Sequence, residues 1–230
     1  MKSDIDALMQ AQNIDAILVT GPAQHNPAMV YFTGGGHLTG ADLIKKRGEA
    51  PVLFHYPMER GEAAATGLPT RSLGDYRLAD LLKQAGGDLL KATVERYRLM
   101  LEDLGVTSGR LLLYGRMEAG AAYATFSALK QALPELEIIG EANSALLMLA
   151  MATKDEGEVA RIRKMGQITT TVVGQVADFL TAHAVKNGIL VKKDGSPLTI
   201  GEVKSRINLW VAERGAENPS GAIFAIGRDA

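Results

Sequence analysis

The chain up to residue 150 alternates short apolar runs with longer amphipathic ones. Four runs have the length and the Ile, Leu and Val content of buried strands: residues 15–20, 51–56, 110–115 and 136–140. Between them, residues 76–104 and 119–133 repeat apolar side chains every three or four positions, the spacing of helices packed on a sheet. Ser3 and Asp6 indicate the capped start of a short helix. The pattern predicts an α/β fold with a mixed or mainly parallel sheet.

A long amphipathic helix is predicted to begin next to Thr153. Thr153 as N-cap and Glu156 three residues later form a capping box, in which each side chain satisfies one unpaired backbone amide. Apolar residues then recur every three or four positions from Val159 to Phe179, so one face of this helix is apolar. Such a face needs a surface to pack against.

A second helix is predicted after a turn at Asp194 and Gly195. Thr199 and Glu202 repeat the capping box, and residues 221–227 have the composition of a strand. Two amphipathic helices and one strand cannot enclose a core. The expected organisation is therefore a complete domain over residues 1–151 and an incomplete one over residues 152–230.

The charge distribution favours a peptide or another small molecule as partner. The 25 basic and 26 acidic residues are mixed along the chain, so no patch for nucleic acid or for an acidic membrane stands out. Cysteine is absent, which excludes disulfides and thiolate metal sites. The N-terminus lacks the apolar core of a signal peptide, and no apolar run reaches the ~18 residues of a membrane span. A cytoplasmic protein is expected.

The residue patterns contain no complete active site. Gly35 and Gly40 fit half of a phosphate-binding loop, but Ala41 and Asp42 replace its Lys and Ser/Thr, so this segment is interpreted as a plain turn that needs positive φ. The four histidines are isolated, and His37 in the glycine loop is the one of most interest. Two further groups have structural interpretations: residues 45–47 as a solvated basic loop, and Met148 and Met151 as core.

Two segments carry a resemblance to a known family. The first, "DAILVTGPAQHNPAMVYFTGGG" (residues 15–36), is similar to the early strand, loop and Tyr-x-x-Gly segment of the creatinase, prolidase and aminopeptidase P family. The second, "ATKDEGEVARIRKMGQI" (residues 152–168), resembles the helix that opens that family's pita-bread catalytic domain. The two segments stand at the expected distance apart, and the resemblance extends over essentially the whole chain.

The resemblance implies a mixed-sheet N-terminal domain of ribonuclease-H-like shape over residues 1–151, used for dimer contacts. Residues 152–230 would be the opening helices and first strand of the pita-bread α+β domain. Relatives bind two divalent metal ions (Mn, Co or Zn) through two Asp, one His and two Glu, and no residue of this chain matches those ligands. No catalytic residue, metal ligand or bound cofactor is therefore assigned to the chain.

The implied function is the N-terminal portion of an Xaa-Pro metallopeptidase, whose two-metal site lies beyond this chain and which acts as a homodimer. The chain alone is expected to be inactive. Two alternatives stay open: a non-catalytic dimerisation or binding module of the same fold, and a creatinase-type hydrolase that uses no metal. In relatives a loop after the Tyr-x-x-Gly segment can reach the partner subunit's active site, which makes His37 the candidate substrate-binding residue.

Overall fold

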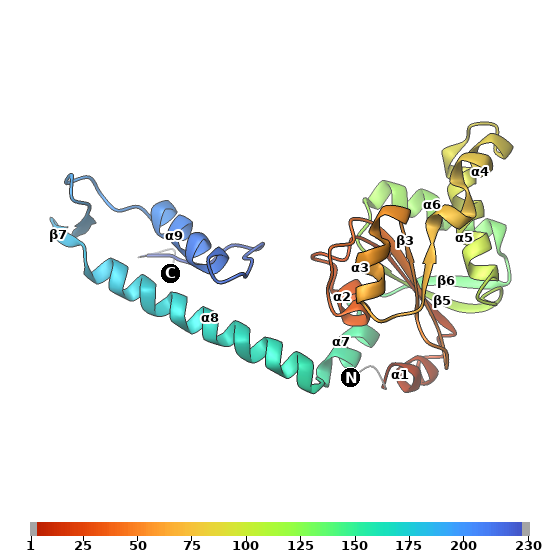
Figure 1. The fold of residues 1–230 in the computed structure, drawn as a ribbon, viewed down its shortest axis with the longest axis horizontal. Coiled ribbons are helices and arrows are strands. Elements are labelled where there is room, and N and C mark those ends of the chain that lie inside the picture. Colours follow the sequence, from red (N-terminus) through yellow and green to blue (C-terminus); the bar gives the residue numbers. More distant parts are fainter. Residues whose placement is uncertain (1–3, 227–230) are drawn as a thin grey trace. The chain divides into compact units, whose positions relative to one another are not determined.

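The computed structural model describes residues 4–226. Its chain divides into two compact units, Met1–Thr153 and Lys154–Ala230 (Figure 1).

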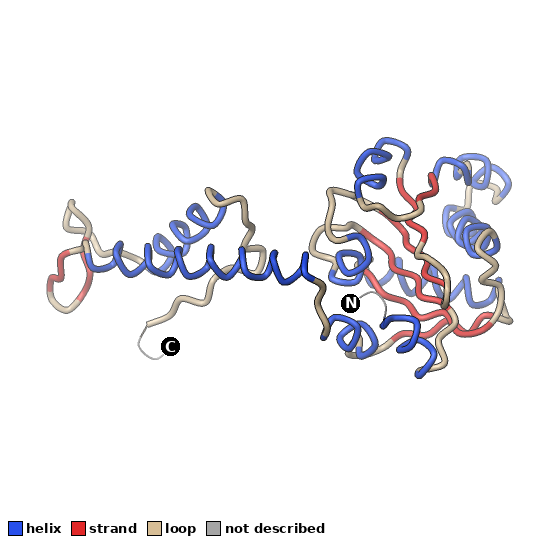
Figure 2. The backbone as a smooth tube through the Cα atoms, turned by 60° about the horizontal axis from the view of Figure 1, so that its bottom comes forward, coloured by secondary structure: helices blue, strands red, loops and turns tan. Residues whose placement is uncertain are grey.

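The first unit is built on one six-stranded mixed sheet (Figure 2). Its strands are β1 Ala16–Gly21, β2 Ala41–Lys46, β3 Val52–His55, β4 Thr70–Ser72, β5 Gly109–Gly115 and β6 Leu136–Gly140, in the spatial order β4-β3-β2-β1-β5-β6. The pairs β1–β2 and β2–β3 are antiparallel, and the pairs β3–β4, β1–β5 and β5–β6 are parallel. The mixed sheet confirms the predicted α/β class.

Helices cover both faces of this sheet, with a separate apolar core under each layer. Four helices supply side chains to one core: α1 Ile5–Ala11, α2 Pro27–Thr33, α3 Arg60–Ala65 and α7 Ala145–Ala152. The other core takes its side chains from the 3-10 helix η3 Leu73–Tyr76, from α5 Leu89–Glu102 and from α6 Ala119–Ala132. The 3-10 helix η2 Pro57–Glu59 precedes α3, and α4 Leu78–Gln84 packs against α5.

Strand β2 overturns the interpretation of residues 45–47 as a solvated loop. Lys45 lies inside this strand and is only 3% exposed. Its Nζ donates to Asp6 Oδ1 at 2.5 Å and to the carbonyls of Lys46 and Glu49. A buried ammonium is tolerated only when it is paired and hydrogen-bonded, and here all three donors have partners.

The glycine pair Gly86 and Gly87 divides the predicted helix over residues 76–104 into α4 and α5. Both glycines have positive φ, 64° and 87°, which ends a right-handed helix. Near the N-terminus, Ser3 lies outside the described residues, and Asp6 hydrogen-bonds to Lys45 and to the Gly48 amide. Met148, expected in the core, is 65% exposed on α7, whereas Met151 packs against the core.

A buried polar group links the sheet to α5. Tyr97 Oη donates to Asp42 Oδ1 at 2.9 Å and lies 3.3 Å from Thr20 Oγ1. Burial raises the pKa of the Asp42 carboxyl above its usual value, although the hydrogen bonds from Thr20 and Tyr97 oppose that shift. Burial, together with the nearby Asp42, also raises the pKa of Tyr97. These three side chains hold α5 on the sheet, because water cannot reach them and each finds its hydrogen-bond partner within the group.

The second unit consists of α8 Glu156–Thr181, the hairpin β7 Ala184–Lys186 and β8 Ile189–Val191, and α9 Ile200–Ala212. The capping box of α8 lies two residues later than predicted, because Asp155 is the N-cap and Glu158 its partner. Thr153 Oγ1 instead donates to Asp4 Oδ2 at 3.0 Å. For α9 the predicted capping box of Thr199 and Glu202 is confirmed.

Two further features of this unit differ from the sequence-based predictions. The hairpin turns at Asn187 and Gly188, both with positive φ, and neither of its strands was predicted. Residues 221–226, predicted to start a strand, have no strand conformation, and Gly227 lies outside the described residues. Within residues 4–226, no helix is both long and apolar enough to cross a membrane.

Candidate functional site

The glycine loop after α2 is the first candidate site. Asn26 caps α2: its side chain accepts from the Met29 amide and donates to the Thr20 carbonyl at 3.0 Å, which fixes the helix to the end of β1. Gly34 ends the helix with φ 77°, and Gly35 and Gly36 follow at 109° and 139°. Three consecutive residues with positive φ are practical only for glycine, as the turn interpretation predicted.

His37 lies exposed immediately after these glycines. Its Nδ1 is 2.8 Å from Nε2 of Gln24. Because an amide NH2 group can only donate, Nδ1 accepts this bond and the ring proton is on Nε2. The Nε2–H group makes no hydrogen bond to any other described residue. The site therefore presents one oriented donor to a ligand's carbonyl or carboxylate oxygen.

Two carboxylates from the η2–α3 segment fix the loop on its other side. Glu59 Oε1 accepts from the Thr39 amide at 2.6 Å and from the Thr39 hydroxyl at 2.7 Å. Glu62 Oε2 accepts from the His37 amide at 3.4 Å. Neither glutamate was predicted from the sequence, since they are 20 and 25 residues from their partners and no local pattern connects them.

The remaining histidines lie on strand β3 and in the turns before α2 and after α8. His55 is buried on β3, with Nδ1 2.8 Å from the Tyr56 carbonyl, and His183 Nδ1 is 2.7 Å from the Phe179 carbonyl. His25 occupies a turn with φ 55°. In the described part of the chain, no three His, Cys, Asp or Glu side chains gather closely enough to hold a metal ion.

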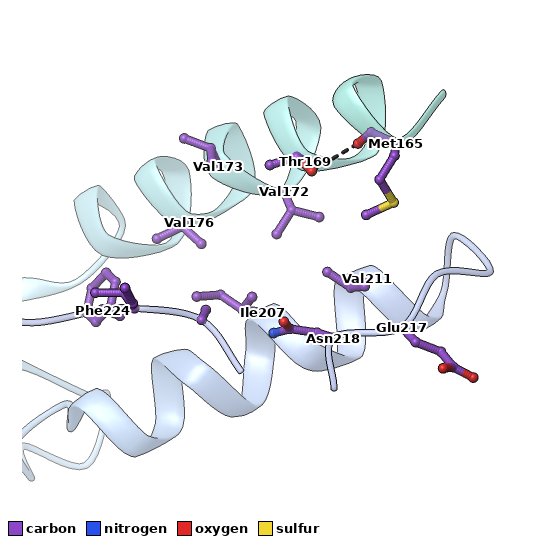
Figure 3. A pocket seen from close by; sticks show the side chains of 12 residues that line it. Met165, Thr169, Val172, Val173, Val176, Ile207, Val211, Glu217, Asn218 and Phe224 are labelled. Carbon is purple, nitrogen blue, oxygen red and sulfur yellow. Dashed lines mark hydrogen bonds between the residues drawn. The ribbon is translucent and has the colours of Figure 1, made fainter. Parts of the chain in front are cut away.

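A hollow of about 370 Å³ in the second unit is the second candidate site (Figure 3). It lies between the apolar faces of α8 and α9, with Val172 and Val176 on one side, Ile207 and Val211 on the other, and Phe224 at its end. The hydroxyl of Thr169 already donates to the Met165 carbonyl at 2.9 Å. The predicted apolar face of α8 is thus confirmed, and the lining of the hollow is mainly apolar, with Glu217 and Asn218 as its polar members besides Thr169.

Solved structures share this fold at low sequence identity. A dipeptidase from Pyrococcus horikoshii OT3 is 17% identical with a TM-score of 0.58, covering 92% of this chain and 49% of the dipeptidase. A prolidase from Thermococcus sibiricus is 13% identical with a TM-score of 0.59, covering 93% and 49%. The N-terminal domain of FACT complex subunit SPT16 from Cicer arietinum is 10% identical with a TM-score of 0.54, covering 93% and 48%.

The chain thus spans about half the length of these solved relatives. Among curated protein sequences, none matches the chain. The model of the Creatinase/Prolidase N-terminal domain family matches residues 3–143, which is more than half of the chain. The chain therefore belongs to the creatinase/prolidase family, and its first unit is the N-terminal domain characteristic of that family.

Proposed function

We propose that the chain is the N-terminal portion of an Xaa-Pro metallopeptidase that hydrolyses the peptide bond before proline. The observation that supports this most strongly is the extent of the structural similarity. The likeness to the dipeptidase and the prolidase covers more than nine-tenths of this chain, so it includes the second unit as well as the N-terminal domain. In this proposal the protein acts on peptides in the cytoplasm as a homodimer.

The described residues of this chain do not form a divalent metal site. They contain no group of three possible ligands close enough together to hold a metal ion. We therefore propose that the ligands of the two metal ions (Mn, Co or Zn) belong to a part of the full-length protein outside this chain. That part would correspond to the half of the relatives that this chain does not match. No catalytic step is assigned to any residue here.

A non-catalytic dimerisation or binding module is the second candidate. It is supported by the similarity to a FACT complex subunit, because the same fold over 93% of this chain occurs in a protein named as part of a complex and not as a peptidase. A creatinase-type hydrolase without metal is a further variant of the enzymatic proposal.

The native gene product, isolated from its source, tests the peptidase proposal. We expect an intact mass well above 24.5 kDa, together with cleavage of an Xaa-Pro dipeptide that chelation abolishes and Mn restores. The 230-residue chain is the control, and it should be inactive with or without metal. A native mass of 24.5 kDa would favour the binding module. A larger product that cleaves the dipeptide unchanged after chelation would favour the metal-free hydrolase.

The His37 side chain provides a second test, on the native dimer. We expect His37→Ala to raise KM for peptide with little change in kcat, because the lost Nε2–H donor positions substrate and takes no part in bond cleavage. Gln24→Ala should have a weaker effect in the same direction, since it only releases the ring orientation. Unchanged kinetics in His37→Ala would remove this residue from the substrate site.

A further inference from the structure

The hairpin of the second unit turns at an asparagine and a glycine that are open to solvent. Asn187 and Gly188 join β7 to β8, and both are exposed. Both have positive φ, 50° and 77°, the conformation that a two-residue hairpin turn requires and that Asn-Gly adopts readily. The pair is also chemically reactive, because a glycine has no Cβ to keep its backbone nitrogen away from the preceding side-chain amide.

The two groups of this pair that can react with each other are not protected by hydrogen bonds. Neither the side-chain amide of Asn187 nor the backbone amide of Gly188 bonds to any described residue. An exposed and unbonded backbone N–H exchanges its proton with water, and the nitrogen that has lost its proton is a nucleophile. Attack of this nitrogen on Asn187 Cγ closes a succinimide ring.

The nearby pair Asp194 and Gly195 shows the protection that Asn187 lacks. The Gly195 amide donates to the Lys192 carbonyl at 2.9 Å. Asp194 Oδ1 accepts from the Ser196 amide at 2.9 Å and from the Ser196 hydroxyl at 2.6 Å. The Ser196 hydroxyl and amide also hold the pKa of the Asp194 carboxyl below its usual value, so this group stays an ionised carboxylate, which nucleophiles attack poorly.

The other five asparagines of the chain are less suited to this reaction, because none of them precedes a glycine. Asn26 and Asn218 precede proline, which has no backbone N–H. Asn208 lies within α9, where the regular helix restrains its backbone. Asn13 and Asn143 precede isoleucine and serine, whose Cβ atoms hinder the approach of the nitrogen. Asn187 is therefore the asparagine with the least hindered nucleophile beside it.

Ring closure requires the backbone at Asn187 to rotate out of its turn conformation, and the hairpin is short enough to permit this. β7 and β8 have three residues each and form a separate two-stranded sheet. All three residues of β7 are exposed. A two-stranded hairpin of this kind is only marginally stable, so its turn opens often at little cost in free energy.

We infer that Asn187 is a site of spontaneous deamidation, which converts this turn into an aspartate or isoaspartate turn. In the first step the Gly188 nitrogen bonds to Asn187 Cγ, the Cγ–Nδ2 bond breaks, and the proton of the Gly188 amide leaves with that nitrogen as ammonia. In the second step water adds to either carbonyl of the ring and opens it, which leaves aspartate or isoaspartate. The reaction consumes only water, and the inference does not rest on the peptidase proposal.

The modification changes both the charge and the length of the turn. Either product carries a carboxylate where Asn187 was neutral. Isoaspartate also routes the main chain through the side-chain methylene, so the turn gains a backbone atom. A lengthened turn no longer matches the pairing of Lys186 with Ile189 across it. The amides of β7 and β8 should therefore exchange hydrogen faster after modification.

Peptide mapping by mass spectrometry, after the full chain has been aged in mildly alkaline buffer, tests the inference. Digestion is run in acid to stop further reaction, and the marker is the small mass gain of replacing NH2 by OH. Methyl transfer by an isoaspartate methyltransferase then identifies the isoaspartate product. We expect the product to accumulate first at Asn187, at no less than about one-tenth of its rate in a synthetic peptide of residues 183–193, because the hairpin opens easily.

Two variants separate this site from other asparagines. Asn187→Gln should abolish the product, because the longer side chain forms the corresponding ring far more slowly. Asn143→Gln, at another exposed asparagine, is the matched control and should leave the product at Asn187 unchanged.

Three outcomes would overturn the inference. The first is an Asn187 that keeps its amide while the synthetic peptide is modified, because the folded hairpin would then protect it. The second is earlier modification of another asparagine or of Asp194. The third is an isoaspartate signal that persists in Asn187→Gln. All three are read without an activity assay, so they are distinct from failure of the peptidase proposal.

Discussion

Replacing Gly115 with alanine is expected to lower the unfolding free energy of the first unit by about 4 kcal/mol. Backbone strain should contribute about 1–3 kcal/mol of this loss, and overpacking about 1–3 kcal/mol. Gly115 has φ 128°, and a Cβ there would lie 2.1 Å from the Thr20 carbonyl oxygen. That oxygen cannot move away easily, because it accepts hydrogen bonds from the Arg116 amide and from Asn26 Nδ2. The substitution should therefore also loosen the glycine loop.

The matched control for Gly115→Ala is Gly86→Ala. Gly86 also has positive φ, 64°, but a Cβ there meets nothing within 4 Å, so only backbone strain of about 1–2 kcal/mol is expected. Urea unfolding followed by tyrosine fluorescence reports on the first unit, since all six tyrosines lie in it and the single Trp210 lies in the second. Equal losses in the two variants would show that contact with the Thr20 carbonyl is unimportant.

Replacing Asp6 with alanine is expected to cost about 3 kcal/mol of stability, because it leaves the buried Lys45 ammonium without its counter-ion. The cost should largely disappear in the double variant Asp6→Ala/Lys45→Met, where an apolar side chain of similar length replaces the charge. Glu102→Ala removes a surface partner of Arg98 and should cost at most about 1 kcal/mol. If the double variant is less stable than Asp6→Ala, the ammonium itself stabilises the fold through its two carbonyl partners.

The loss of stability in Asp6→Ala should depend on pH and become smaller in acid. Partial burial alone would raise the pKa of Asp6, but hydrogen bonds from Lys45 and the Gly48 amide outweigh it and hold the pKa below its usual value. A lowered pKa in the folded state adds stability above the unfolded-state pKa of about 3.9. That contribution is lost as the pH falls through the folded-state pKa. The difference between wild type and Asp6→Ala should therefore be constant near neutral pH and shrink in acid.

Elements that are determined by their own local sequence were predicted, whereas elements that depend on residues far away in the sequence were missed. Strands β1, β3, β5 and β6 are mainly apolar, and each was located to within a residue or two. Strand β2 ends in two lysines, and the partner that permits burial of Lys45 is Asp6, 39 residues earlier. No window of sequence around Lys45 contains that information.

Some errors came from competing local signals. Thr153 and Asp155 both offer a capping box, and tertiary contact decides between them, because the Thr153 hydroxyl is used by Asp4. The hairpin of the second unit could have been found from its Asn187–Gly188 pair, which is typical of a two-residue turn. At the candidate site, the positive φ of the glycines was predicted, and the substrate-binding role of His37 stays a prediction. Glu59 and Glu62 could not be predicted, because they reach the loop only through the packing of η2 and α3.

The position of β1 in the sheet also constrains how the chain assembles during synthesis. β1 pairs with β2, which follows soon after it, and with β5, whose first contacts to the β1 region join residues 95 positions apart. At about 5–20 residues per second, the ribosome adds β5 on the order of 5–20 s after β1. During that interval β1, β2 and β3 can form an antiparallel meander. The edge of β1 that later pairs with β5 has no neighbouring strand until β5 has been synthesised.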